Sequence, residues 1–225
     1  MMYCISYAHE ELREQAEVLA ARYSLTLAAQ VLPRLHLTTS GLELLDSQGS
    51  PITMDWNRQV LQQRNDLLKA TLAHKKLTIY DITAGWGRDA LLMANAGSSV
   101  VMVEKNPLMA AMLEDCLARL DNQQLRSRIS LVWSCAKQFL ETLSLPAVIY
   151  LDPMHPKRVK TALVKKHLHT LQSFIPPNDD VIELITLARL KQPQRLVLKW
   201  PSKQSPPLRP NFSYHGKTID YHIYL

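Results

Sequence analysis

Hydrophobic and polar positions follow two periods along the last two thirds of the chain. Short apolar runs are typical of strands, and amphipathic runs with a period near 3.6 are typical of helices. From Lys76 onward the order strand, loop, helix repeats. The predicted strands cover 77–81, 99–104, 129–133, 147–151 and 195–199, and the predicted helices cover 88–96, 107–120, 136–143, 163–174 and 179–190. This alternation predicts a parallel α/β sheet.

The two ends of the chain depart from this rhythm. Near the C-terminus, runs at 211–214 and 218–224 flank a turn, Tyr214-His-Gly-Lys, which predicts an antiparallel hairpin. Such a hairpin beside a parallel sheet is common in methyltransferases and unusual in dinucleotide dehydrogenases. The N-terminal part has its own pattern, with helices predicted at 10–23 and 60–72 and strands at 35–38, 42–45 and 52–56. We therefore expect a small N-terminal α+β extension over 1–74 and a Rossmann-like, class I methyltransferase sheet over 75–225.

Composition narrows the possible partners and the compartment. The 225-residue chain has a formal net charge of +6, which favours an anionic partner such as nucleic acid. Its three cysteines, Cys4, Cys116 and Cys135, form no CxxC pair, so we expect neither a disulfide framework nor a metal site. There is no secretory signal pattern and no apolar run of the ~18–20 residues that span a bilayer. These features predict a cytoplasmic protein without membrane partners.

The segment Asp81-Ile-Thr-Ala-Gly85-Trp-Gly87-Arg-Asp89 lies between a predicted strand and a predicted helix. Two glycines allow a sharp turn and a close approach of the backbone to a ligand. In a dinucleotide enzyme the following helix end holds a pyrophosphate. In a methyltransferase the same loop holds the methionine part of the cofactor, and Asp81 and Asp89 suit its ammonium group. The alternative is a tight turn without a ligand.

Two further strand ends are candidate cofactor contacts. Glu104 lies nineteen positions after Gly85, where a carboxylate can accept hydrogen bonds from ribose hydroxyls. This holds for adenosyl and NAD ligands alike. Ser134-Cys135-Ala136 follows the third strand, where small residues leave room for an adenine ring. A solvated charge and an ordinary loop are the alternatives at these two positions.

The segment Asp152-Pro153-Met154-His155 follows an apolar strand, at the sheet edge where open α/β folds bind ligands. It is similar to the (Asp/Asn)-Pro-Pro-aromatic motif of enzymes that methylate exocyclic amines of bases. There a side chain and a backbone carbonyl accept hydrogen bonds from the target amine, and an aromatic ring stacks on the base. Asp152, Pro153 and His155 are accordingly our candidate catalytic residues, with a Pro-bounded turn as the alternative.

Basic residues gather directly after this segment and are candidates for phosphate contacts. They are Lys157, Arg158, Lys160, Lys165 and Lys166. A solvated helix face explains such a run equally well. Lys199-Trp200-Pro201 ends another strand on the same side, where Trp200 either packs or stacks on a base.

Four of these segments together resemble the bacterial ribosomal RNA small subunit methyltransferase J family. They are Asp81 to Ala90, Val103 to Pro107, Tyr150 to Met154 and Lys160 to Lys166, and the resemblance runs from about Thr78 to Trp200. It implies transfer of a methyl group from S-adenosyl-L-methionine to N2 of one guanosine in 16S ribosomal RNA, free or in the small subunit. It also implies cofactor contacts by Arg88, Asp89, Glu104, Lys105, Cys135, Ala136 and Asp152.

The sequence departs from the family pattern at four places. The family usually has His-Arg-Arg with several glycines where this chain has Asn57 to Asp66 without glycine. Its usual Ser-Ser pair is Cys135-Ala136 here, its usual Phe is His155, and its Lys-Arg-Pro is Lys199-Trp-Pro201. These changes affect the RNA side more than the cofactor side.

Two other functions remain open from the residues. Gly85-x-Gly87-x-x-Ala90 fits the dinucleotide fingerprint of an NAD-dependent oxidoreductase, although that fingerprint is weak alone. Asp152-Pro153 and the lack of a separate substrate domain count against it. A non-catalytic RNA-binding or ribosome-assembly factor on a methyltransferase scaffold is the other alternative. Asp81, Glu104 and Asp152 argue against a scaffold, whereas His155 and the missing glycines of 57–66 argue for one.

Overall fold

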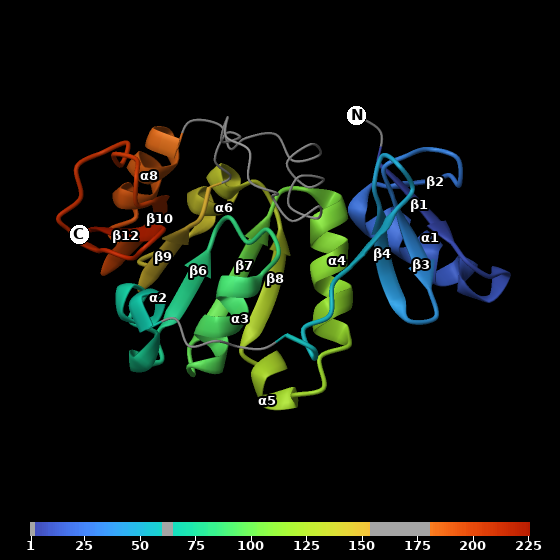
Figure 1. Ribbon diagram of the computed structural model, residues 1–225, viewed down its shortest axis with the longest axis horizontal. Coiled ribbons are helices and arrows are strands. Elements are labelled where there is room, and N and C mark those ends of the chain that lie inside the picture. The colour runs from blue at the N-terminus through green and yellow to red at the C-terminus, as the bar shows by residue number, and fades with distance from the viewer. Residues whose placement is uncertain (1–2, 60–64, 154–180) are drawn as a thin grey trace. The chain divides into compact units, whose positions relative to one another are not determined.

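The computed structural model describes residues 3–59, 65–153 and 181–225 of the chain (Figure 1). These residues group into two compact units. The first contains a five-stranded sheet with two helices, and one of these helices, α4, comes from the middle of the sequence. The second contains a seven-stranded sheet with the remaining helices. The division at 74/75 stays a prediction.

The first unit has a sheet with strand order β2-β1-β3-β4-β5. Its elements are β1 (Cys4–Tyr7), a 3-10 turn (Glu10–Leu12), α1 (Arg13–Tyr23), β2 (Thr26–Leu27), β3 (Arg34–Thr38), β4 (Gly41–Leu45), β5 (Pro51–Thr53) and α4 (Pro107–Ala118). β1 and β2 were not predicted, and β5 ends before the predicted Trp56. Strands β3 and β4 are antiparallel, and alternate residues such as Leu35 and Leu44 are buried. That alternation is the pattern that predicted them.

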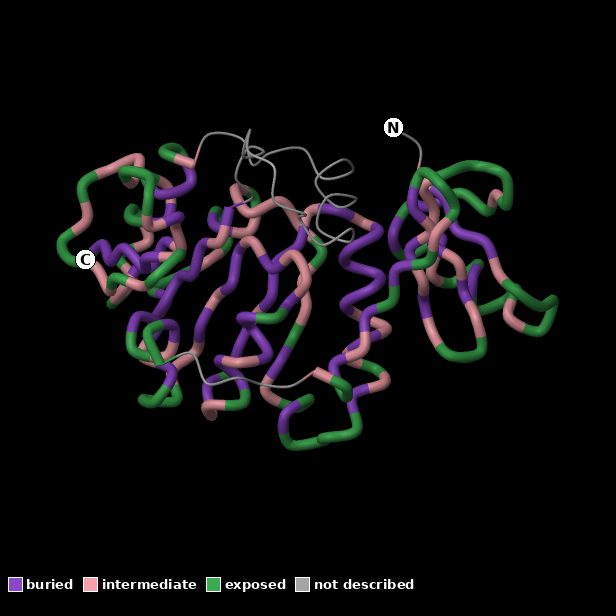
Figure 2. Tube along the Cα trace, in the orientation of Figure 1, coloured by how far each residue is buried: buried purple, intermediate pink, exposed green. Residues whose placement is uncertain are grey.

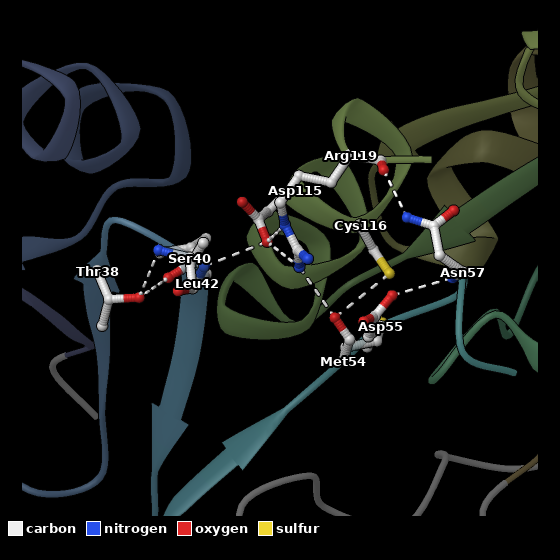
Figure 3. A network of polar contacts seen from close by, with 10 residues as sticks. Thr38, Ser40, Leu42, Met54, Asp55, Asn57, Asp115, Cys116 and Arg119 are labelled. Carbon is white, nitrogen blue, oxygen red and sulfur yellow. Dashed lines mark hydrogen bonds and ion pairs between the residues drawn. The ribbon is translucent and has the colours of Figure 1, made fainter. Parts of the chain in front are cut away.

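Helix α4 joins this unit through a polar network around Arg119 (Figure 3). The guanidinium group donates from Nε and Nη2 to Oδ2 of Asp115, at 2.9 and 2.6 Å, and from Nη2 to the carbonyl of Met54 at 2.9 Å. The backbone N–H of Leu42 donates to the same Asp115 oxygen at 3.1 Å. Asn57 donates to the carbonyl of Arg119 at 2.8 Å. The network therefore ties the helix end to β4 and to the chain just after β5.

The second unit has a sheet with strand order β11-β12-β10-β9-β6-β7-β8. Its elements are α2 (Asn65–Ala70), a 3-10 turn (Ala73–Lys75), β6 (Thr78–Asp81), α3 (Arg88–Asn95), β7 (Ser99–Glu104), α5 (Gln123–Arg126), β8 (Ile129–Trp133), α6 (Ala136–Thr142), β9 (Val148–Leu151), α8 (Val181–Leu190), β10 (Arg195–Pro201), β11 (Phe212–Tyr214) and β12 (Ile219–Tyr224).

Strands β6 to β10 are parallel, and β12 runs antiparallel to both β10 and β11. The predicted parallel sheet and C-terminal hairpin are thus confirmed. The short helix α5 was not predicted. The predicted helix 163–174 lies outside the described residues, as do 60–64 of the predicted helix 60–72.

The core of this unit lies on both faces of the sheet, and Figure 2 shows the central strands buried. Ile149 and Leu151 of β9 pack in one cluster with residues of α6 and α8. Side chains alternate along a strand, so Tyr150 faces the other side, where its hydroxyl reaches α3. Strand order reverses between β6 and β9, which makes the carboxyl ends of these strands the switch point where open α/β sheets bind ligands.

Among the described residues, no helix is long and apolar enough to cross a bilayer.

Candidate functional site

The loop between β6 and α3 takes a conformation that requires its glycines. Gly85 and Gly87 have φ of +52° and +63°, a region that costs other residues about 1–2 kcal/mol. The N–H of Gly87 donates to the carbonyl of Ala84 at 2.8 Å, which closes the turn. Helix α3 begins directly afterwards at Arg88, which is exposed. The loop therefore presents backbone at the switch point of the sheet.

Two buried carboxylates flank this loop. Asp81 ends β6 and its Oδ1 accepts a hydrogen bond from the N–H of Thr83 at 3.2 Å. Burial raises the pKa of Asp81 well above its usual range, and the charge of Asp89 raises it further. Asp89 lies in the first turn of α3 and is also buried. A positively charged ligand group between them would offset the repulsion that these carboxylates exert on each other.

Glu104 ends β7 and belongs to the same site. Its Oε2 accepts a hydrogen bond from the N–H of Gly85 at 2.9 Å, so the strand end and the glycine loop are joined directly. The carbonyl of Glu104 accepts from the N–H of Ser134, at 3.1 Å. The carboxyl ends of β6, β7 and β8 are therefore held together by hydrogen bonds.

The residues predicted for the adenine side lie at the start of α6, after a tryptophan that ends β8. Cys135 precedes the first residue of α6, Ala136, and both are partly buried. Trp133 ends β8 opposite Glu104, with 39 % of its surface exposed. Its indole N–H donates to the carbonyl of the partly buried Lys105 at 3.3 Å. An exposed ring beside small residues suits a flat aromatic ligand.

Asp152 follows β9 on the other side of the switch point. Its N–H donates to Oγ1 of Thr83 at 2.6 Å, which connects this loop to the glycine loop. Its Oδ2 accepts from Nζ of Lys199 at 2.6 Å. Pro153 is buried next to it. The candidate amine acceptor and the candidate cofactor loop thus lie at one sheet edge.

Lys199 was not predicted as a site residue, yet it bridges two that were. Its Nζ donates to Oδ2 of Asp89 and to Oδ2 of Asp152, at 2.6 Å in each case. Burial alone lowers the pKa of Lys199, but the charges of Asp152 and Asp89 and their hydrogen bonds outweigh burial and raise it above its ordinary value. The two carboxylates therefore favour the charged form of the lysine.

Tyr150 and Thr83, like Trp133, are further site residues that the sequence did not indicate. The hydroxyl of Tyr150 donates to Oδ2 of Asp89 at 2.6 Å. Burial raises the pKa of Tyr150 well above its usual range, and the charge of Asp89 contributes. The one signal for Lys199 in the sequence is its position at the end of an apolar strand, on the same edge as Asp152.

The remaining predicted residues lie outside the part of the chain that the structure describes. They are His155, Lys157, Arg158, Lys160, Lys165 and Lys166. The base-stacking and phosphate contacts assigned to them stay predictions.

Comparisons with known proteins identify the family and the fold of the chain. A family model described as "Putative SAM-dependent methyltransferase" matches residues 18–225. A ribosomal RNA small subunit methyltransferase J of Legionella pneumophila is 38% identical, covering 98% of this chain and 95% of that protein. The protein of the same name from Thioalkalivibrio sulfidiphilus is 35% identical, covering 98% and 96%. A solved SAM-dependent methyltransferase from Neisseria gonorrhoeae has a TM-score of 0.75 at 22% identity over 98% of this chain and 96% of that one, which supports the fold.

Proposed function

The chain belongs to the ribosomal RNA small subunit methyltransferase J family, a group of S-adenosylmethionine-dependent enzymes, and on this basis we propose that it methylates the exocyclic N2 amine of one guanosine in 16S ribosomal RNA. The observation that carries the proposal is the position of Asp152. Asp152 lies at the switch point, and its backbone N–H joins it to the glycine loop through Oγ1 of Thr83. An acceptor for an amine is thereby held beside the loop that binds the cofactor.

The residues at the switch point suit S-adenosylmethionine. Asp81 and Asp89 are buried carboxylates that can receive its ammonium group, and Glu104 can receive the ribose hydroxyls. Cys135 and Ala136 leave room for adenine, and the family resemblance adds Arg88 and Lys105. When bound, this cofactor supplies a methyl group on a sulfonium, whose C–S bond breaks toward sulfur as the new N–C bond forms.

The chain's own contribution is orientation and charge. A guanine amine is a weak nucleophile because its lone pair is delocalised into the ring. Asp152 and the carbonyl of Pro153 accept hydrogen bonds from the amine and hold it in line with the methyl group. His155 would stack on the base. The methylated nitrogen then loses one proton to water, so a strong base is unnecessary.

The basic residues beyond His155 are proposed to contact phosphates of the RNA. They are Lys157, Arg158, Lys160, Lys165 and Lys166. The net charge of +6 favours such a partner. A ribosomal substrate also implies that the protein acts in the bacterial cytoplasm.

Label transfer tests the proposed reaction. Purified protein is incubated with tritiated S-adenosylmethionine and either free 16S RNA or small subunits that lack the modification, and the labelled nucleoside is identified by mass spectrometry. We expect N2-methylguanosine at one position in at least one of the two substrates. Label at another atom, or none in either substrate, would contradict the proposal.

A parallel binding assay separates the alternatives. Binding of S-adenosylhomocysteine without any transfer would favour a scaffold that assists ribosome assembly. Binding of NAD in its place would favour an oxidoreductase.

A further inference from the structure

The carboxyl edge of the second unit contains a lysine between two carboxylates that come from different elements. Strand register explains part of this arrangement, because β10 pairs with β9 in parallel and sets Leu198 opposite Leu151. Lys199 and Asp152 are therefore the next residues on adjacent strands. Asp89 is supplied by the first turn of α3. Three segments thus converge on one ammonium group.

The exposed fraction of the side chain increases from Asp89 through Lys199 to Asp152. The side chain of Asp89 is 8% exposed, that of Lys199 is 14% exposed and that of Asp152 is 35% exposed. Asp152 is thus the member of the cluster that a substrate can reach. Lys199 lies behind it, and Asp89 is the deepest of the three.

Stability alone is a weak reason for such a cluster. Burying a lysine costs several kcal/mol in desolvation, and apolar residues of similar size often replace buried ion pairs without loss of stability. A surface pair in the same unit, Lys137 with Glu183, avoids this cost because both side chains are about one third or more exposed. Perturbed charges at a ligand-binding edge are instead typical of functional sites.

We propose that Lys199 is a positioning residue for methyl transfer: its ammonium group fixes the carboxylates of Asp89 and Asp152, so that Asp152 meets the target amine as an oriented, ionised acceptor. This inference rests on the proposed function, because it takes the role of Asp152 from there. Lys199 acts through Asp152 and touches neither cofactor nor base.

Removing the lysine charge leaves several acidic groups facing one another. Asp81 from β6, Asp89 from α3 and Asp152 after β9 surround the position, with the hydroxyls of Tyr150 and Tyr221 close by. Repulsion among like charges raises the proton affinity of each of these carboxylates, Asp152 included. A protonated Asp152 is a poorer acceptor. As the pH is lowered, methyl transfer by a variant without the lysine charge should therefore be lost at a higher pH than in the wild type.

The test compares Lys199→Met, Lys199→Arg and Lys137→Met in steady-state methyl transfer across pH, using tritiated S-adenosylmethionine and unmodified small subunits. Lys137→Met is the matched control, since it removes the same charge from a surface ion pair. We expect Lys199→Met to lower kcat by about 10- to 100-fold and to move the acidic limb of the pH profile to higher pH by about one unit or more. Lys199→Arg keeps the charge and should keep the acidic limb, and Lys137→Met should behave as wild type.

A folded Lys199→Met enzyme with wild-type kcat and pH profile would overturn the inference while leaving the proposed function intact. Absence of transfer by the wild type would refute both. If Lys199→Met does not fold, the arginine variant decides, because positioning predicts a kcat about tenfold lower with an unmoved acidic limb. An arginine variant that loses thermal stability alone, with wild-type kcat, would assign Lys199 a structural role.

Discussion

Two of the cations that carboxylates hold, one in each unit, have different surroundings. Arg119 in the first unit bonds to Asp115, four residues earlier, and to the carbonyl of Met54. Lys199 in the second unit bonds to two carboxylates from separate elements at the carboxyl edge of a parallel sheet. The same type of ion pair thus closes a local junction in one unit and borders a ligand-binding edge in the other.

The comparison teaches that location, more than chemistry, indicates the role of a buried charge. The partners of Arg119 lie in helix α4 and in the chain just after β5, which the residue fastens together, and Figure 3 shows them converging on one helix end. The partners of Lys199 are the residues that the proposed reaction uses. We therefore expect changes at the first cluster to affect stability and changes at the second to affect methyl transfer.

The largest effect is expected at Asp152. Replacing it with alanine removes the acceptor for the target amine, and a hydrogen bond to a charged group contributes about 1.5–3 kcal/mol. Asp152→Ala should therefore lower kcat in the methyl-transfer assay by about 10- to 100-fold. Asp121→Ala, at an exposed position, serves as control. Equal kcat values for the two variants would show that Asp152 takes no part in methyl transfer.

A smaller effect, on stability, is expected at Arg119. Arg119→Leu leaves Asp115, whose side chain is 13% exposed, without its guanidinium partner, and should lower the free energy of unfolding by about 2–3 kcal/mol. Arg22→Leu is the control, because Arg22 pairs with Glu114 at a side chain 55% exposed and should cost at most about 1 kcal/mol. Urea denaturation measures both. A cofactor affinity lowered in Arg119→Leu, with stability unchanged, would break the comparison.

The smallest effect concerns a glycine beside the Arg119 network. Gly41 has φ of +114°, and a Cβ there would lie 2.5 Å from Nε of Arg119 and 2.9 Å from Oδ2 of Asp115. Gly49 also has a positive φ, +75°, but its Cβ would meet only Leu32, at 3.8 Å. Gly41→Ala should thus be about 1–2 kcal/mol less stable than Gly49→Ala in urea denaturation. Equal losses of unfolding free energy in the two variants would mean that the Arg119 network shifts to admit the added Cβ without cost.

Much of the second unit was predictable from the sequence because its strands are continuous apolar runs separated by amphipathic helices. Strands β7 and β8 begin and end where predicted, at Ser99–Glu104 and Ile129–Trp133. The strands of the first unit were harder to predict from the sequence. β1 has four residues and β2 has two, too few for a periodic pattern, and the pairing of β1 with both β2 and β3 depends on contacts distant in sequence.

The candidate site was partly predictable for a related reason. Asp81, Glu104 and Asp152 each end or follow a strand, and parallel strands bring such positions to one edge. The role of Lys199 was not predictable, because its contact with Asp152 depends on the register between β9 and β10. The contact of Tyr150 with Asp89 likewise depends on which face of the sheet α3 covers.

Calorimetric titration with S-adenosylhomocysteine tests most directly whether the carboxyl edge of the seven-stranded sheet binds the cofactor. The titration compares wild type with Glu104→Gln and with Glu114→Gln, a matched substitution in the first unit. We predict equal affinities for wild type and Glu114→Gln, an affinity about tenfold or more weaker for Glu104→Gln, and no heat with NAD. Equal affinities for all three proteins, or binding of NAD in place of the homocysteine product, would contradict the account.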